Sequence, residues 1–309
     1  MAVDLSPIDE SLLATIANIH GMPKGAFNIR RDGQLVERHN SAFIEISTKK
    51  DNPGIDITVQ PGTKGETVFI PVIVTQSGLK DVVYNTFYIG DDCDIEIVAG
   101  CGIHNSSHAA SEHDGIHSFH IGKNSRVKYI EKHYGEGEGT GDRILNPTTN
   151  VYMAENSFCE MEMIQLRGVT STVRETYAKL DAGAKLILTE RLLTHDDQKA
   201  VSNVRVELEG DDSNVQVISR SVAQDNSEQI FNPLVVGKAA CRAHVQCDSI
   251  IMGDARVKSI PGIEAASPDA ILMHEAAIGK IAGEQITKLM TLGLTEEEAE
   301  QEILDDFLS

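Results

Sequence analysis

Thiol and imidazole side chains gather in one short stretch of the chain. Residues 101–120 contain one cysteine and five of the eleven histidines: Cys101, His104, His108, His113, His117 and His120. Thiolate and imidazole are ligands for iron, zinc and copper. The spacing follows neither a CxxC nor an HExxH pattern. From the residues alone, loop histidines in solvent and histidines facing a core therefore remain alternatives to a metal site.

A second group of reactive side chains lies near the end of the chain. Cys247 stands between Gln246 and Asp248, and His274 is followed directly by Glu275. A thiolate, an imidazole and a carboxylate form either a metal site or a nucleophile with its base. Because most buried cysteines are inert, a purely structural cysteine is the alternative.

The elements that must position these side chains repeat along the sequence. Each repeat starts with Gly or Ala, continues through a short polar turn and ends in alternating apolar residues, with anchors at Gly90, Gly122, Ala154, Ala182, Gly210 and Gly237. The anchors lie 27 to 32 residues apart, a period typical of stacked supersecondary units. No helical pattern separates the strands, so the repeat predicts an all-β core built as a parallel β-helix, or β-solenoid. A large antiparallel sandwich is the alternative.

Helical patterns flank the predicted strands. Ser6-Pro7-Ile8-Asp9 is typical of a capped helix start, and the apolar spacing that follows predicts a helix to about His20. Thr295 begins a second capping pattern near the end of the chain. We therefore expect an N-terminal helical region at 1–41, a β-helix core at 42–272 and a C-terminal helical domain at 273–309.

Composition excludes several classes of protein. The 309 residues include 27 Lys and Arg against 47 Asp and Glu, a net charge of −20, which disfavours nucleic-acid binding. The sequence shows no signal peptide and no apolar run of membrane-spanning length, so we expect a cytoplasmic protein that does not bind membranes. The five scattered cysteines are expected to be reduced thiols.

Nucleotide and hydrolase motifs are missing from the sequence. Ile278-Gly279-Lys280 lacks the upstream glycine of a phosphate-binding loop, and no G-x-S-x-G pattern occurs. We expect a scaffold protein, not an enzyme, without a nucleotide site of its own.

Several motifs together resemble one known family. The C-terminal ones are the run 246–253 (Gln-Cys-Asp-Ser-Ile-Ile-Met-Gly), Pro268, His274-Glu275-Ala276, Glu284-Gln285 and the stretch 293–299; upstream, Gly100-Cys101 precedes His117-Ser118-Phe119-His120. Over roughly residues 55 to 309 the chain resembles the SufB/SufD scaffolds of iron–sulfur cluster assembly. The resemblance implies a right-handed parallel β-helix between a small N-terminal helical region and a C-terminal helical domain.

The resemblance also implies site residues. It places the cluster-building cysteine at Cys247, its acidic partner at Glu275 and the histidine of SufD-type subunits at His274. Cys101 matches the cysteine that receives sulfur, while His117 and His120 are additional candidate metal ligands. His104, His108 and His113 have no counterpart. The glutamate makes the chain more similar to SufB than to SufD, although the long N-terminal region of SufB is missing.

Partners follow from the same resemblance. It implies a transient iron–sulfur cluster, either 2Fe-2S or 4Fe-4S, and a SufC-type ABC ATPase. The candidate contact for this ATPase is the pair of C-terminal helices, because their apolar stripe, which includes Ile286, Leu289 and Met290, is wider than two helices can bury alone. It further implies a dimer with a second copy or with a SufB/SufD paralogue, and a cysteine desulfurase or other sulfur donor. The alternatives are a carbohydrate-active β-helix enzyme, which the absence of Trp and the 5% aromatic content disfavour, and a structural solenoid without a cluster.

Overall fold

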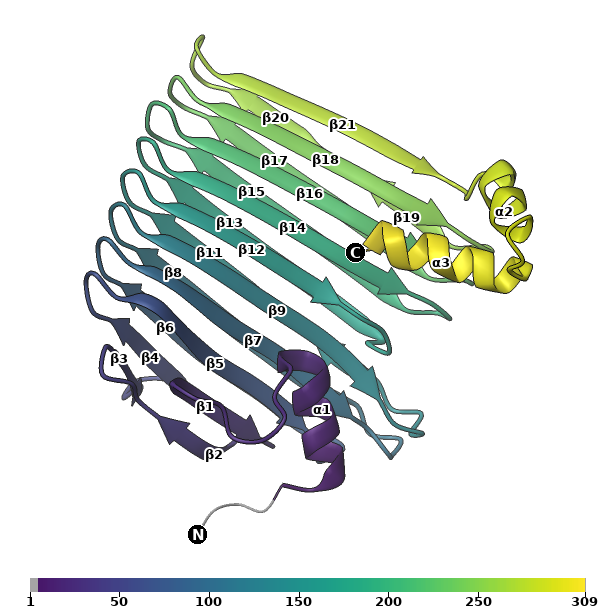
Figure 1. The fold of residues 1–309 in the computed structure, drawn as a ribbon, viewed down its shortest axis with the longest axis horizontal. Coiled ribbons are helices and arrows are strands. Elements are labelled where there is room, and N and C mark those ends of the chain that lie inside the picture. Colours follow the sequence, from purple (N-terminus) through teal and green to yellow (C-terminus); the bar gives the residue numbers. More distant parts are fainter. Residues whose placement is uncertain (1–4, 309) are drawn as a thin grey trace.

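Two long sheets enclose the core of the protein (Figure 1). The structure is a computed structural model and describes residues 5–308. The first sheet contains, in spatial order, β2 (Gln34–His39), β1 (Ala26–Arg31), β5 (Lys64–Val74), β7 (Asp94–His104), β9 (Arg126–Glu136), β12 (Phe158–Gln165), β14 (Lys185–Thr194), β16 (Asn214–Ala223), β18 (Arg242–Ile251) and β21 (Ile271–Gly279). The second contains β19 (Arg256–Ser259), β17 (Glu228–Gly237), β15 (Lys199–Leu208), β13 (Ser171–Leu180), β10 (Arg143–Leu145), β8 (Ser111–Ile121), β6 (Lys80–Ile89), β4 (Gly54–Val59) and β3 (Ile44–Thr48), while β11 (Thr148–Met153) pairs with β8 and β13, and β20 (Gly262–Ala265) with β17.

Successive strands alternate between the two sheets, and each coil pairs in parallel with the coils on either side. This arrangement confirms the predicted parallel β-solenoid. Two hairpin pairs at the N-terminal end, β1–β2 and β3–β4, are antiparallel. Strands β1 and β2 occupy part of the segment that was assigned to the N-terminal helical region.

The polar turns of the repeat contain residues with left-handed backbone conformation. Asp92, Asn124 and Asn156 occupy equivalent turns at φ of +55° to +58°, a conformation that Asn and Asp adopt more readily than other residues with a side chain. The anchor Gly122 is needed because a Cβ there would lie 2.6 Å from the backbone of Gly90. Turn chemistry thus fixes how one coil stacks on the next.

The inward-facing residues of successive coils form continuous rows. One such row in the first sheet is apolar and buried: Ile97, Tyr129, Met161, Leu188, Val217 and Val245. Alternate residues of each strand point outward, as the period of two requires. A residue's parity along its strand therefore decides whether it reaches the interior.

Helix α1 (Pro7–Ala17) covers the outer face of the first sheet near its N-terminal end (Figure 1). Ser6 and Asp9 form the predicted capping box. Leu12 lies against Gly102 of β7, and a Cβ at Gly100 would lie 2.9 Å from the Ile16 side chain. Glycine on this strand therefore allows the helix to approach the sheet closely.

The C-terminal end of the solenoid is formed by β21, followed by helices α2 (Gly283–Met290) and α3 (Glu296–Leu308). Ile278 lies in the segment 273–309 that was expected to be helical, but it belongs to β21. Among the described residues β18 is the strand neighbour of β21. The side chains of Ile271, Met273 and Ile278 remain exposed. No helix in residues 5–308 is long and apolar enough to span a membrane.

Candidate functional site

Cys247 and His274 meet inside the last coil. Cys247 lies on β18 and His274 on the adjacent β21, where both strands turn these residues toward the interior. The Cys247 Sγ atom is 3.8 Å from Nε2 of His274, and only 2% of Cys247 is exposed. The structure thus brings together a thiol and an imidazole that are far apart in the sequence.

The environment of Cys247 keeps its thiol protonated. Burial raises the pKa of Cys247, and the nearby acids Asp248 and Glu190 act in the same direction, whereas a hydrogen bond with Ser259 opposes the shift. A raised pKa reduces the fraction of thiolate, which is the form that binds metals. Metal binding at this cysteine must therefore displace a proton.

Glu275 lies on the opposite face of the same strand pair. It follows His274 directly and therefore points outward, where its Oε1 is 3.0 Å from Nε2 of His244. Within one chain the structure does not bring Glu275 to Cys247. The sequence did not indicate a role for His244. The strand register identifies it: Gln246 pairs with Glu275, and His244 is the next outward residue of β18, two positions before Gln246.

Cys101 lies in the interior toward the other end of the solenoid. It is 2% exposed and is paired in register with His133 of β9. Both residues line a cavity of about 20 Å³, together with His113, His117 and Glu131. This volume is enough for about one water molecule.

A buried charged network borders the cavity through Glu131 and His117. Glu131 accepts a hydrogen bond from Arg174 Nη1 at 2.6 Å and another from the Tyr129 hydroxyl at 3.0 Å. The same hydroxyl is 2.8 Å from Nδ1 of His117. Of these four residues only His117 was predicted, as a candidate ligand, and no contact among the four was predicted. They come from three different strands, and sequence spacing does not reveal their contact.

Burial and charge shift the pKa values of this network in opposite directions. Burial lowers the pKa of His117 to about 4, although the charge of Glu131 opposes it. Burial alone would raise the pKa of Glu131, but Arg174 and the histidines hold it well below its usual range. The pKa of Cys101 is raised well above its ordinary value by burial and by the charges of Asp81 and Glu131.

Polar side chains continue from this cavity toward the last coil. One inward row of the first sheet runs from Glu131 through Met163, Glu190 and Ser219 to Cys247. The Glu190 carboxylate accepts a hydrogen bond from Ser202 Oγ of the second sheet at 2.8 Å. Cys101 and Cys247 thus lie at the two ends of one partly polar interior.

The remaining predicted histidines are spread over different environments. His120 faces outward and stacks between Tyr88 and Tyr152, with ring centroids 5.3 and 5.1 Å away. It therefore does not converge with the inward His117. His113 contacts Asp81 in the interior at 3.1 Å, His104 contacts Glu136 at 3.2 Å, and His108 contacts Thr140.

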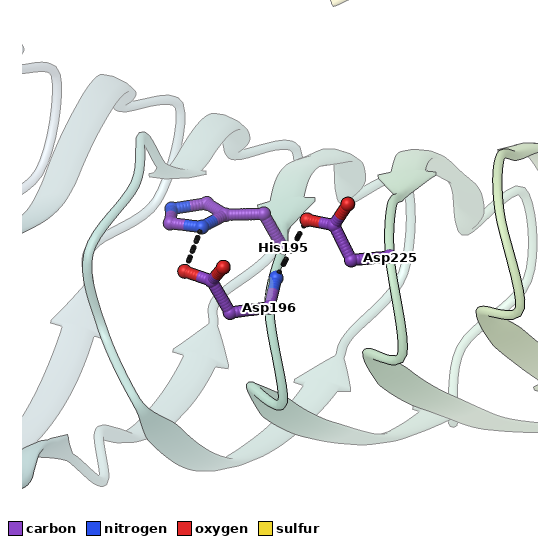
Figure 2. A group of neighbouring side chains, drawn as sticks. All are labelled: His195, Asp196 and Asp225. Atoms are coloured by element: carbon purple, nitrogen blue, oxygen red, sulfur yellow. Dashed lines mark hydrogen bonds and ion pairs between the residues drawn. The ribbon is translucent and has the colours of Figure 1, made fainter.

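A third group of donor atoms lies at a corner between two coils (Figure 2). The side chains of His195, Asp196 and Asp225 place one ligand atom each within 4.8 Å of the others. His195 Nδ1 is 2.7 Å from Asp196, and Asp225 accepts a hydrogen bond from the Asp196 backbone N–H at 2.9 Å. These hydrogen bonds stabilise the two stacked turns, and this role accounts for the group.

The fold and the interior define a class: a parallel β-solenoid with a cysteine–histidine pair in its last coil. The sequence profile described as "SUF system FeS cluster assembly, SufBD core domain" matches residues 78–307. The chain belongs to this family, which confirms the family inferred from the motifs.

Curated relatives agree with this membership. An iron-sulfur cluster assembly SufBD family protein of Methanocaldococcus jannaschii is 27% identical over 293 residues, which cover 93% of this chain and 90% of the relative. A SufBD family protein of Archaeoglobus fulgidus is 26% identical over 89% of this chain and 73% of its own length. One from Pyrococcus horikoshii is 40% identical over a shorter stretch, covering 29% of this chain and 21% of the relative.

Proposed function

We propose that this chain is a scaffold on which an iron–sulfur cluster is assembled and from which it is passed on. The observation that carries the proposal is the contact between Cys247 and His274 in the last coil. Thiolate and imidazole both ligate iron in mixed iron–sulfur sites. Ligands from two adjacent strands are held by backbone pairing, which keeps them in place when a cluster enters or leaves.

Sulfur is accepted at Cys101 in this proposal. The cysteine lies beside imidazoles and the Glu131–Arg174 pair. The imidazoles and the Glu131 carboxylate can accept the proton of the Cys101 thiol. The row from Glu131 to Cys247 offers polar neighbours along the interior between the two cysteines. The sulfur donor is a cysteine desulfurase or another persulfide carrier.

A SufB-type role and a shared site belong to the same proposal. Glu275, the residue that distinguishes the SufB type, points away from its own Cys247 but lies on the exposed terminal strand β21. A second copy or a paralogue that docks at this strand brings its own cysteine and carboxylate next to those of the first chain. The cluster site then forms at the dimer interface.

A SufC-type ATPase supplies the movement. Its docking surface in this proposal is α2, where Ile286, Leu289 and Met290 form an apolar stripe and Met290 is 44% exposed. This helix follows β21 directly, so movement of α2 acts on the strand that holds His274. The chain itself contributes ligands and a rigid frame.

The ligand assignment is tested by replacing Cys247. We expect Cys247→Ala to abolish cluster formation in anaerobic reconstitution with ferrous iron and sulfide, followed by visible absorption and labile-sulfide content. Cys159→Ala is the matched control, because Cys159 is a fully buried cysteine of the apolar core on the same sheet. Wild-type cluster content in Cys247→Ala would refute the assignment.

A further inference from the structure

A second pair of metal-binding side chains lies directly behind the Cys247–His274 pair. His244 of β18 and Glu275 of β21 share the outer face of the terminal strand pair, with 3.0 Å between Nε2 and Oε1. Two donor atoms that each lie about 2.1 Å from one octahedral ion, at a right angle, are about 3.0 Å apart. A separation of 3.0 Å therefore fits either a hydrogen bond or two adjacent ligand positions around one metal ion.

Exposure distinguishes the outer pair from the inner one. The side chains of His244 and Glu275 are 31% and 60% exposed, whereas Cys247 is 2% exposed. An ion arriving from solvent therefore meets the outer pair first. Asp248, on the same outer face of β18, adds negative charge and accepts a hydrogen bond from Gln246 at 2.6 Å.

We propose that His244 and Glu275 form a receiving site for ferrous iron on the outer face, before the iron reaches Cys247. This inference rests on the proposed scaffold function and adds His244 to its ligands. Imidazole nitrogen and carboxylate oxygen bind divalent iron, manganese and cobalt. The ion replaces the hydrogen bond between the two side chains. Nε2 of His244 ligates the ion while the ring proton is carried on Nδ1, and water fills the remaining positions.

The terminal position of the strand pair provides the route inward. In the described chain β21 has β18 as its neighbour on one edge, and the solenoid ends at its other edge. Cys247 and His274 are on the inner face of the same two strands. Iron held by Glu275 therefore has only the edge of β21 to pass, and Ile271, Met273 and Ile278 of this strand remain exposed.

Cobalt binding tests the outer pair apart from the cluster. The full chain with Cys247→Ser is titrated anaerobically with Co²⁺, and binding is followed by visible absorption and equilibrium dialysis. We expect one Co²⁺ bound without a thiolate-to-metal charge-transfer band, and at least tenfold weaker binding in His244→Ala and in Glu275→Gln. His104→Ala is the matched control, because His104 and Glu136 form a similar outward pair, 3.2 Å apart, on the same sheet.

Iron dependence tests the role in assembly. In the chain with Cys247 intact, His244→Ala should slow cluster formation at limiting ferrous iron and reach wild-type cluster content at excess iron. A purely structural role would lower the final content at every iron concentration. Unchanged Co²⁺ affinity in both outer-pair variants, or equal loss in His104→Ala, overturns the receiving site. Failure of the scaffold function shows separately, as a cluster that survives Cys247→Ala.

Discussion

Glu131 and Arg174 form a buried ion pair in the interior. Their side chains are 4% and 8% exposed and lie 2.6 Å apart. Removing one partner of a buried pair costs about 3–5 kcal/mol, because the other charge is left without compensation. We expect this loss for Arg174→Met in urea unfolding. The double variant Glu131→Gln/Arg174→Met should recover much of it, and equal losses in both would contradict the pairing argument.

His117 makes stability depend on pH. Its pKa falls from 6.5 to about 4 in the folded protein, so between these values the unfolded chain binds a proton that the folded chain does not. Stability is therefore lost as the pH decreases from 6.5 toward 4, by about 1.4 kcal/mol per pH unit. We expect the unfolding free energy of His117→Asn to fall less steeply across this range.

His133 provides the internal comparison for that experiment. Its pKa is also lowered by burial, so part of the pH dependence should persist in His117→Asn. A variant with the full wild-type slope would show that His117 is already protonated in the folded protein at these pH values.

Residue types identified the cysteines of the candidate site but not their surroundings. Cys101, Cys247 and His274 followed from motifs, and the last two do meet. The contacts of Arg174 with Glu131 and of His244 with Glu275 were not predicted, because each joins different coils. Such contacts depend on the strand register, which a single sequence does not specify.

At the scale of elements, the turns determine the stacking of coils. Asn124 has a φ of +55° and donates a hydrogen bond to Asp92 at 3.2 Å. Asn124→Ala should destabilise the protein by about 1 kcal/mol, because alanine adopts the left-handed conformation at a cost. Asn124→Gly should retain most of the stability. Thermal unfolding measures both, with Lys123→Ala as the control in the same exposed turn.

A loss in Asn124→Gly as large as that in Asn124→Ala would assign the effect to the hydrogen bond and not to the backbone.

The repeat anchors made these turns predictable, because Gly, Asn and Asp have a known preference for such conformations. The extent of β21 was not predictable in the same way. Ile278 fits an apolar helix pattern as well as a strand, and pairing with β18 decides in favour of the strand.

At the scale of the whole molecule, the exposed terminal strand is the expected dimer contact. Unpaired strand edges recruit further strands, and charged residues on an edge prevent this. Met273 is 57% exposed on β21. We expect Met273→Lys to shift the protein from dimer to monomer in analytical ultracentrifugation at micromolar concentration. Ile8→Lys is the control, since Ile8 is 40% exposed on α1.

A wild-type protein that is monomeric under these conditions, both alone and mixed with a SufB/SufD family protein, would remove the shared-site proposal. The overall architecture was the most predictable feature of this chain. A fixed repeat with no helices between its strands leaves few ways to bury both sheets, and stacking is the one the protein adopts. The β1–β2 hairpin lay outside that repeat and carried no comparable signal.

The strand spacing of the first sheet also fixes the distance between the two cysteine-containing coils. From the coil of Cys101 to that of Cys247 there are five strand-to-strand steps, from β7 through β9, β12, β14 and β16 to β18. Each step is about 4.8 Å, which sets the two coils about 24 Å apart along the stack. Backbone hydrogen bonds fix every step, so thermal breathing does not bring the two ends together. The distance changes only in increments of a whole coil, and a homologue with one coil more would keep both ends chemically intact while moving them about 4.8 Å further apart.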